Sequence, residues 1–554
     1  MRGELAIHHL GVRVGLGQNP FGRDVANLAL FRAFARHGGF ERLHLLTPFR
    51  IDPAAAHEAL SAGETLATEV EYGSLLDQGR MARAGVLFRG KADLPELAWA
   101  RRSAGRDLDY SLVGLIHTLA PPLTRQEIAL ASVAPVEPWD AIVCTSPAVQ
   151  GAMQTMFAEW TDYLGQKFGG PERPAPMLPM IPLGVDLAEM TALADRPQVR
   201  AAARARLGLS EDDVLVLWVG RLSFFEKAAP QPMFRAVEEA GRKVGRPLHF
   251  ALAGWFPNPE HRPLFEEAAK GYAPTTPVHW IDGNDRVLLG EMWAAADIFL
   301  SLVDNIQETF GLAPVEAMAA GLPIVASDWD GYRFTLQHGR QAFLASSLIP
   351  APGRPSAGML RRHQLRIDSY QAYAGHVAYY TAINVREAAD GLAALAASPD
   401  MRRRLGQGGR QRVREVFDWP QVMRRYRELF DELAAIRQRA ASASRAPKLN
   451  PVSGDPFRDF AGFATKVLSP ETRFALREGV SPGDEVALAL TVRLDGFADA
   501  WRAPPDALRR LVEGLAETPW RALGDIVSEV PPSERAGVTY GLVWLCKMGV
   551  LDWL

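Results

Sequence analysis

The sequence predicts an α/β protein with two parallel-sheet halves, followed by a small and mostly helical domain. Short buried strands alternate with amphipathic helices from the N-terminus onward, as in parallel α/β folds. The alternation pauses at a Gly/Pro-rich run, residues 166–182, and restarts at residue 214. A chain of 554 residues is also too long for one hydrophobic core. Two or three domains are therefore expected.

In the first half, a Gly-rich loop separates the first strand from the first helix. The loop runs from Gly15 to Gly22, and the helix covers Asp24 to Arg36 and ends at Gly38-Gly39, the usual C-terminal punctuation. The expected strands are residues 5–12, 43–47, 111–116 and 141–145.

In the second half, continuous apolar runs are typical of strands buried on both faces of a parallel sheet. The expected strands are residues 214–219, 248–253, 278–281, 298–303 and 324–326, and the clearest helices are 230–244 and 312–320.

These patterns give domain boundaries as well. The expected domains are 1–190, an N-terminal Rossmann-like domain, and 191–417, a C-terminal Rossmann-like domain. A helix over 418–440 is expected to return to the first domain, an Ala/Ser/Arg-rich linker covers 437–449, and residues 450–554 form an accessory domain.

Composition narrows the class of protein. The net charge of −3 gives no reason to expect nucleic-acid binding, and the basic clusters 402–404 and 424–425 fit solvated helix faces.

Two distant cysteines, Cys144 and Cys546, lie in apolar runs, which predicts buried thiols and a reducing compartment. The chain shows no signal peptide and no apolar stretch of about 20 residues. A cytoplasmic protein is expected, and peripheral contact with the inner face of the membrane remains open.

Two carboxylates flank the start of the helix 312–320. Glu308 lies in the loop after a buried strand, and Glu316 lies inside the helix. A helix N-terminus attracts anions such as phosphate, and a carboxylate beside it can accept hydrogen bonds from sugar hydroxyls. Ligands of open α/β sheets bind at this edge. An ordinary solvated loop glutamate and an exposed helix glutamate would fit the same spacing.

Two cations follow the neighbouring strand 214–219. Arg221 comes just after its carboxyl end, and Lys227 follows in the same loop. Together they can neutralise a diphosphate, Arg through a planar fork and Lys as a point charge. Alone they would fit two solvated loop cations, but beside the acidic helix unit they favour a diphosphate site.

The second half resembles the retaining GT-B glycosyltransferases of the large family 4 type, the glycosyl transferases group 1. The most specific motif is Glu308-x7-Glu316 with the following run to Ser327, and Gly220-Arg221-Leu with Lys227 is similar to that family's diphosphate-binding pair. In the first half, three further motifs resemble the family: Ile116-His117-Thr-Leu, Cys144-Thr-Ser146 and Ile181-Pro-Leu-Gly184-Val-Asp186. The resemblance covers roughly residues 5–435, and it implies an acceptor-side role for the domain 1–190 and a nucleotide-sugar-binding role for the domain 191–417.

The resemblance implies a role for each matching residue. Glu316 would bind the donor's ribose hydroxyls, Glu308 would lie by the transferred sugar, and His117 would contact that sugar near the reacting carbon. Arg221 and Lys227 would bind the diphosphate and stabilise it as leaving group, without a metal or other cofactor. The remaining donor-binding positions would be Gly22, whose loop approaches the diphosphate, and the backbone N–H groups of Phe310, Gly311 and Leu312.

The chain departs from the family pattern at several positions. Phe21 precedes Gly22 where many relatives have a second glycine, and Thr309 stands where a glycine usually precedes Phe-Gly-Leu. Ala228 replaces the glycine after the lysine. The common Gly-Gly-x-x-Glu pattern becomes Asp330-Gly331-Tyr-Arg-Phe-Thr335, which leaves the contacts to the donor sugar open.

The sequence therefore predicts a hexosyltransferase of polysaccharide biosynthesis that uses a UDP-, GDP- or ADP-sugar and a glycan or lipid-linked acceptor. A same-fold nucleotide-sugar epimerase and a non-catalytic glycan-binding or regulatory protein are the alternatives. The accessory domain, with helices expected at 505–515, 520–530 and 538–548 and a terminal apolar strand, faintly resembles a winged-helix module. It lacks a basic recognition face, so a protein partner is favoured over nucleic acid, and a packing extension is equally open.

Overall fold

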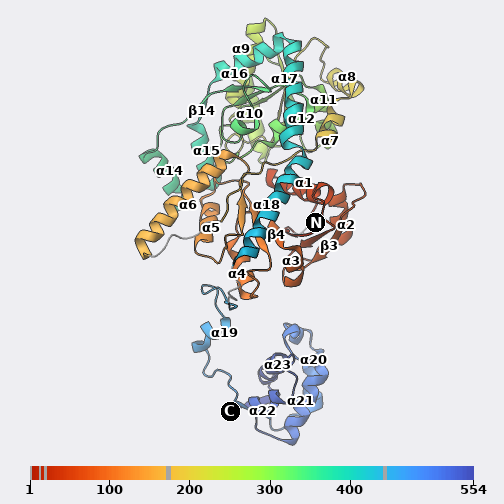
Figure 1. Ribbon diagram of the computed structural model, residues 1–554, viewed down its shortest axis with the longest axis vertical. Coiled ribbons are helices and arrows are strands. Elements are labelled where there is room, and N and C mark those ends of the chain that lie inside the picture. Colours follow the sequence, from red (N-terminus) through yellow and green to blue (C-terminus); the bar gives the residue numbers. More distant parts are fainter. Residues whose placement is uncertain (1–2, 12–13, 18–20, 170–175, 441–445) are drawn as a thin grey trace. The chain divides into compact units, whose positions relative to one another are not determined.

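A computed structural model describes residues 3–11, 14–17, 21–169, 176–440 and 446–554. Parts of the predicted Gly-rich loop and of both predicted linkers lie outside these residues. The chain forms two compact units, Met1–Asn450 and Pro451–Leu554 (Figure 1).

The first unit begins with a parallel sheet of six strands in the order β3-β2-β1-β4-β5-β6. Its strands are β1 (Glu4–His8), β2 (Arg42–Leu46), β3 (Glu69–Gly73), β4 (Val86–Arg89), β5 (Ser111–Leu115) and β6 (Ala141–Val143). Helices α1 (Gly22–His37) and α2 (Pro53–Ser61) cover one face. The other face packs against α3 (Gln78–Ala84), α4 (Pro95–Ser103), α5 (Pro122–Ala129) and α6 (Pro147–Phe168).

A second parallel sheet repeats this plan, in the order β9-β8-β7-β10-β11-β12. Its strands are β7 (Leu215–Val219), β8 (His249–Gly254), β9 (Val278–Asp282), β10 (Ile298–Ser301), β11 (Ile324–Ser327) and β12 (Ala342–Ala345). One face packs against α7 (Leu187–Ala194), α8 (Pro197–Arg206), α11 (Arg286–Ala295) and α12 (Leu312–Ala320). The other packs against α9 (Pro230–Val244), α10 (Arg262–Tyr272) and α16 (Val385–Ala397).

Both sheets therefore have the doubly wound order of a Rossmann fold. The predicted two-domain α/β architecture of the GT-B type is confirmed. In each sheet the chain reverses direction of winding between two central neighbours, β1 and β4 in the first and β7 and β10 in the second. Ligands of such sheets bind at the carboxyl ends of these two strands.

The chain crosses between the two halves twice, and the crossings lie side by side. The N–H of Val185 donates to the carbonyl of Phe417 (2.9 Å), and the N–H of Trp419 donates back to Val185 (3.3 Å). A Cβ added to Gly184 would lie 2.4 Å from the Trp419 ring, so the predicted interdomain turn needs its glycine. The close packing keeps the two crossings together.

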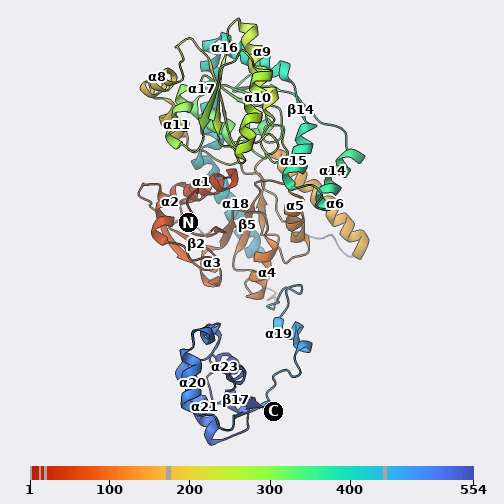
Figure 2. The ribbon, with the colours of Figure 1, turned by 180° about the vertical axis from the view of Figure 1, so that it is seen from behind.

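After the second sheet the chain returns to the first. Helix α17 (Pro399–Arg412) leads into α18 (Trp419–Arg439), which runs along the first half in both views (Figures 1 and 2). The rings of Tyr426 and Phe430 pack on Phe34 of α1, with centroids 5.2 and 6.2 Å apart. One apolar core runs through these helices and both sheets.

An insertion that sequence patterns did not reveal lies between β12 and α16. It contains a two-stranded antiparallel ribbon and two helices: β13 (Ser347–Leu348), α14 (Arg354–Gln364), α15 (Tyr370–Tyr379) and β14 (Ala382–Ile383). Helix α15 packs on the loop that follows β7, because a Cβ on Gly375 would lie 2.7 Å from Cβ of Phe225.

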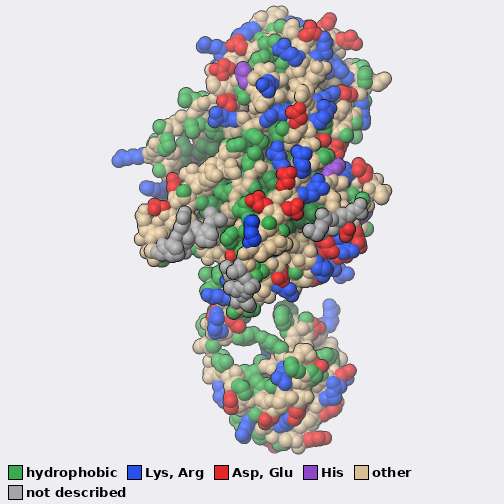
Figure 3. Space-filling model, in the orientation of Figure 1, with side chains coloured by type: hydrophobic (Ala, Val, Ile, Leu, Met, Phe, Trp, Pro, Cys, Tyr) green, Lys and Arg blue, Asp and Glu red, His purple; other side chains and the backbone are tan. Residues whose placement is uncertain are grey.

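The two basic clusters are part of ordinary helix surfaces. Arg402 donates to the carbonyl of Leu395 (2.7 Å), and Arg424 pairs with Glu428 of its own helix (3.9 Å). On the face of the first unit seen in Figure 3, basic and acidic side chains are interspersed. The exposed Arg403, Arg404 and Arg424 match the predicted solvated faces, whereas Arg402 is half-buried.

The second unit is a small domain with its own core. A three-stranded antiparallel sheet, in the order β16-β15-β17, packs against helices around Phe474, Val512 and Leu542. The strands are β15 (Arg473–Leu476), β16 (Arg521–Ala522) and β17 (Leu551–Trp553), and the helices are α20 (Pro482–Thr491), α21 (Pro505–Glu517), α22 (Leu523–Ser528) and α23 (Arg535–Lys547). A short helix, α19 (Pro456–Asp459), precedes them.

Several predicted boundaries were wrong. The first strand stops at His8, and β10 stops at Ser301, because the backbone turns at the sheet edge while apolar side chains continue into the loops. The helix expected at 520–530 is divided into β16 and α22. Cys144 is buried as predicted, but Cys546 is only half-buried.

Candidate functional site

Three loops meet at the carboxyl edge of the second sheet. They follow β7, β10 and β11, and these strands are adjacent, because β10 pairs with both β7 and β11. The first loop carries Arg221 and Lys227, and the second carries Glu308. The switch point of the sheet therefore collects the charged residues that the sequence singled out.

Glu308 and Lys227 form an ion pair at the start of α12. Lys227 Nζ lies 2.6 Å from Glu308 Oε2, and both side chains are largely buried. Glu308 Oε1 accepts a hydrogen bond from the N–H of Gly311 (3.0 Å), and the N–H of Phe310 also donates to this carboxylate. Burial opposes ionisation, but the Lys227 ammonium and these N–H groups outweigh it and lower the pKa of Glu308. The carboxylate is ionised at neutral pH.

The backbone of this loop requires its glycine. Gly311 has φ 91°, and a Cβ there would lie 2.3 Å from the Tyr332 ring. Only glycine fits this left-handed position under an aromatic ring. The turn leads directly into Leu312, the first residue of α12. Two of the three N–H groups predicted to bind an anion, those of Phe310 and Gly311, thus hold Glu308 in this structure.

Arg221 extends from the end of β7 toward the first half of the unit. Its Nη1 lies 3.1 Å from Glu226 Oε2, and its guanidinium lies over the Phe21 ring, 5.2 Å from the centroid. Phe21 also packs edge-on against Trp255, with centroids 6.5 Å apart. The next residue, Gly22, begins α1, and a Cβ added there would meet no atom within 4 Å.

Glu316 has a different environment from Glu308. It is half-buried in α12, and the described residues offer its carboxylate no hydrogen bond. Burial raises the pKa of Glu316 to about 7, against a weaker attraction from Arg286 and Lys227. A polar partner such as a ligand hydroxyl would satisfy this carboxyl group.

His117 comes from the first half, just after β5, and contacts the loop of Glu308. Its backbone carbonyl accepts a hydrogen bond from Thr309 Oγ1 (2.9 Å). Its Nε2 lies 2.9 Å from Oδ1 of Asn27, whose Nδ2 donates to the carbonyl of Gly90 (3.1 Å). Burial, helped by the nearby Arg23 guanidinium, lowers the pKa of His117 to about 4. The ring is neutral at pH 7.

The Thr309 contact joins the two halves at the site. Thr309 is one of the positions where the chain departs from the family pattern, which has a glycine there. Its hydroxyl bridges loops that are 192 residues apart in the sequence. The departure therefore adds a link that a glycine could not make.

Sequence reasoning missed two acids at the same sheet edge, the buried Asp304 and the half-buried Asp330. Asp304, after β10, accepts from the N–H of Ala229 (3.3 Å) at the start of α9, and burial raises the pKa of Asp304 to about 7. Asp330, after β11, lies near Glu308 and has a raised pKa as well. The signal for Asp330 was present, since it replaces a glycine of the family pattern.

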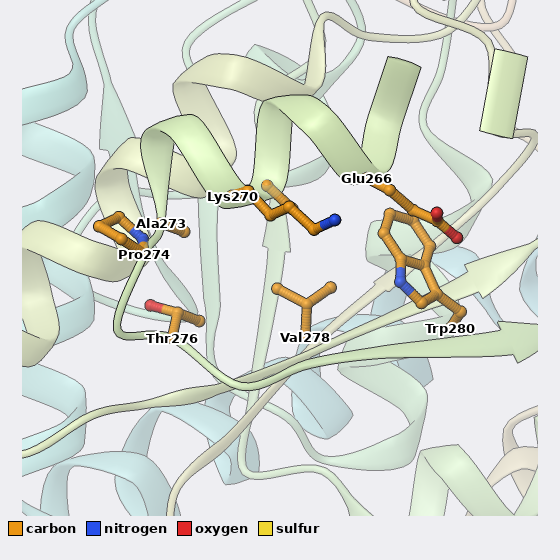
Figure 4. A pocket seen from close by; sticks show the side chains of 8 residues that line it. Glu266, Lys270, Ala273, Pro274, Thr276, Val278 and Trp280 are labelled. Carbon is orange, nitrogen blue, oxygen red and sulfur yellow. The ribbon is translucent and has the colours of Figure 1, made fainter. Parts of the chain in front are cut away.

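Other features of the first unit give no second candidate for this chemistry. Among the described residues, no group of three or more His, Cys, Asp or Glu is placed to hold a metal ion. A cavity of about 360 Å³ lies between α10 and the edge strand β9, and Figure 4 shows Lys270 and Trp280 in its lining. It includes none of the predicted site residues.

The fold and the site define a two-domain α/β protein with paired charges at the switch point of its second sheet. Residues 199–348, which contain these charges, match the family model described as "Glycosyl transferases group 1". The second half of the first unit is therefore similar to glycosyltransferases of this group over residues 199–348.

Named relatives agree with that match. A D-inositol 3-phosphate glycosyltransferase of Geodermatophilus obscurus is 29% identical over 202 residues, 35% of this chain and 43% of that protein. The protein of the same name from Nocardia farcinica is 29% identical over 272 residues, 48% of this chain and 56% of that protein. The chain thus spans about half the length of these curated relatives.

Solved structures share a lower sequence identity with the chain. A UDP complex of HepE from Anabaena has a TM-score of 0.49 and 14% identity, over 78% of this chain and 100% of that chain. Sucrose-phosphate synthase from Thermosynechococcus elongatus has the same TM-score and coverage with 17% identity. The fold assignment rests on the order of the strands in this chain's own sheets.

Within the described part of the chain, every helix is too short or too polar to cross a bilayer.

Proposed function

We propose that the protein is a retaining glycosyltransferase that moves a hexose from a nucleotide-diphosphate sugar to a glycan or lipid-linked acceptor. The observation that carries the proposal is the Lys227–Glu308 pair at the start of α12, with Arg221 beside it at the switch point. Two cations in one loop at the switch point suit a diphosphate, and the ionised carboxylate that Lys227 and the loop N–H groups hold in place suits sugar hydroxyls.

The reaction breaks the bond between the anomeric carbon and the diphosphate oxygen. Positive charge develops on the sugar and negative charge on the leaving diphosphate. Arg221 and Lys227 stabilise the leaving group, and Glu308 accepts hydrogen bonds from the sugar. The acceptor hydroxyl attacks the anomeric carbon from the face that the diphosphate leaves. Its proton passes to the leaving phosphate, so the configuration is retained without a protein nucleophile or a metal.

Two further residues complete the donor site. Glu316, which lacks a partner among the described residues, binds the ribose hydroxyls. His117 approaches the transferred sugar from the first half as a neutral ring, because its pKa is lowered to about 4. Gly22 and the N–H of Leu312 remain proposed contacts to the diphosphate.

The proposal names a class of acceptor and no individual acceptor compound. Relatives that are similar over part of the chain are named for D-inositol 3-phosphate, so this compound belongs in a panel of acceptors beside glycans and lipid-linked sugars. A same-fold epimerase would convert the donor without an acceptor, and a non-catalytic protein would do neither. The accessory domain is proposed to contact a protein partner or the glycan chain.

A thermal-shift screen of UDP-, GDP- and ADP-sugars tests the proposal. We expect one base to raise the melting temperature of the full-length protein, and less so in K227A. The selected donor is then incubated with each acceptor, and free nucleoside diphosphate is measured. Release that depends on the acceptor supports transfer. A donor epimer formed without acceptor supports the epimerase, and no shift with any nucleotide would sink the site.

A further inference from the structure

Asp330 lies in the turn between β11 and α13 (Tyr332–Thr335), at the sheet edge where Glu308 lies. The turn presses on the loop that carries Glu308, because a Cβ added to Gly331 would lie 2.4 Å from Cα of Phe310 and 2.6 Å from the carbonyl oxygen of Thr309. The two loops are therefore packed against each other without an intervening side chain at this point.

The backbone of Asp330 is unusual for a residue with a side chain. Its φ is 42°, in the left-handed region that glycine adopts freely and aspartate and asparagine tolerate. The family pattern has a glycine here. The chain thus keeps the left-handed turn and adds a carboxyl group to it, next to the carboxylate of Glu308.

One oxygen of this carboxyl group lacks a partner. Asp330 Oδ1 is buried, and the described residues give it no hydrogen bond, while the N–H of Gly331 donates to the carboxyl group. Burial raises the pKa of Asp330 to about 8, and the negative charge of Glu308 adds to this effect. At pH 7 the group is a neutral acid with an O–H to donate.

The charged and titratable neighbours of Asp330 have other partners. Glu308 is bonded to Lys227 and to backbone N–H groups, and the Tyr332 hydroxyl lies 2.8 Å from Ser301 Oγ. A buried donor without a partner is costly, so a ligand group is the remaining candidate for satisfying it.

We propose that Asp330 is a sugar-binding residue that donates a hydrogen bond from its carboxylic acid to a hydroxyl of the transferred sugar. The role rests on the proposed function and assigns the contact that the missing Gly-Gly-x-x-Glu pattern left open. Glu308 accepts from the sugar and Asp330 donates to it. The pair thereby fixes the orientation of two hydroxyls and selects among hexoses that differ there.

Calorimetry with paired ligands tests this assignment. The pair is UDP and UDP-glucose, or GDP and GDP-mannose where the screen selects guanosine, measured on the full-length protein at pH 6.5 and pH 9. The variants are D330G and D330N, both compatible with a left-handed backbone. D328N, in the same turn, is the matched control. The quantity compared is the ratio of the two dissociation constants, nucleotide over nucleotide-sugar.

We expect D330G to lower this ratio about tenfold at pH 6.5, as for loss of one hydrogen bond in a buried site. D330N, whose amide still donates, keeps the ratio, and D328N leaves it unchanged. Raising the pH to 9 ionises Asp330 and lowers the wild-type ratio, but does not lower that of D330N.

Two results would overturn the role of Asp330. One is a ratio in D330G equal to that of the wild type, and the other is the same pH dependence in D330N and wild type. Failure of the wild-type protein to bind any nucleotide is a different outcome. It would overturn the proposed function itself, and the sugar contact with it.

Discussion

The two sheets of the first unit share one strand order but carry different chemistry at their carboxyl edges. The second sheet presents Arg221, Lys227 and Glu308 from the two strands at its switch point. The first sheet presents a neutral His117 near the Arg23 guanidinium, and Lys91, which follows β4, pairs with Asp93 and Glu127. The same fold therefore supports a Lys–Glu pair held by backbone N–H groups in one half and a neutral histidine with separate ion pairs in the other.

This difference indicates which half is expected to bind which part of the donor. Charged side chains that are removed from water need buried partners of opposite charge. The second half supplies these partners within one domain. The first half reaches that site through side chains such as the Thr309–His117 and Arg221–Phe21 contacts. Binding of the nucleotide is therefore expected to depend on the second half, and positioning of the sugar on both.

The largest expected effect is on the charged pair of the second half. Lys227→Ala should lower turnover by about 10²–10³-fold, because a preorganised cation no longer stabilises the leaving diphosphate. Acceptor-dependent release of nucleoside diphosphate measures this loss. Lys270→Ala, an exposed lysine of the same half, is the control. Activity of Lys227→Ala within about threefold of the wild type would contradict the proposed difference between the two halves.

A second test addresses Arg221, which links the halves. Arg221→Ala should weaken binding of the nucleoside diphosphate by about tenfold to a hundredfold, since charge-assisted hydrogen bonds are lost. Titration calorimetry gives the affinity. Arg221→Lys keeps the charge but not the planar fork and should lie between the two. Arg235→Ala, exposed on α9, should match the wild type, and unchanged affinity in Arg221→Ala would remove Arg221 from the site.

The first half is tested through His117. His117→Ala should reduce turnover by about tenfold, in the range of single positioned groups, while donor affinity changes by less than about threefold. The pKa of His117 is lowered to about 4, so protonation of this ring should affect turnover only as the pH falls toward 4. Steady-state kinetics from pH 4.5 to 8 would show this. Equal losses in turnover and in affinity would make His117 a structural residue.

A pH-dependent stability effect sharpens the contrast between Glu308 and Glu316. The folded-state pKa of Glu316 is raised to about 7, so the folded protein holds a proton that the unfolded chain releases near the ordinary glutamate pKa of 4.5. The free energy of unfolding should therefore fall as the pH rises from about 4.5 to 7. The expected loss is about 1–2 kcal/mol, because solvent screens this half-buried group.

The measurement is the melting temperature of wild type and Glu316→Gln at pH 5 and pH 8, without ligand. The variant should gain relative to the wild type at pH 8, because its amide cannot ionise. A constant difference between the two proteins at both pH values would contradict the raised pKa.

The smallest effect is expected at Gly22. Gly22→Ala should change the free energy of unfolding by less than about 0.5 kcal/mol, because the added Cβ meets no atom within 4 Å. The matched variant Gly331→Ala should destabilise by about 2 kcal/mol or more, since its Cβ would lie 2.4 Å from Cα of Phe310. Urea denaturation distinguishes them. A large loss for Gly22→Ala would show that this position is constrained within the fold.

Much of the fold could be predicted because buried strands of parallel sheets are continuous apolar runs. The helices at 230–244 and 312–320 were predicted to the residue, and the strands around them to within a few positions. Strands β3, β4 and β12 were missed, since Glu69–Gly73 is a polar edge strand and both Val86–Arg89 and Ala342–Ala345 are very short. The insertion between β12 and α16 has too few apolar residues in register to show a pattern.

The sequence by itself determined the α/β class, the two halves, and the residue types at the strand ends that suit a diphosphate and a sugar. Those conclusions follow from local patterns, since strand burial and helix punctuation are encoded within a few residues. Only the tertiary structure decided that Lys227 bonds to Glu308 and that Thr309 reaches His117, because these partners lie 81 and 192 positions apart. It also decided which carboxyl groups stay neutral, since burial and neighbouring charge depend on how the loops pack.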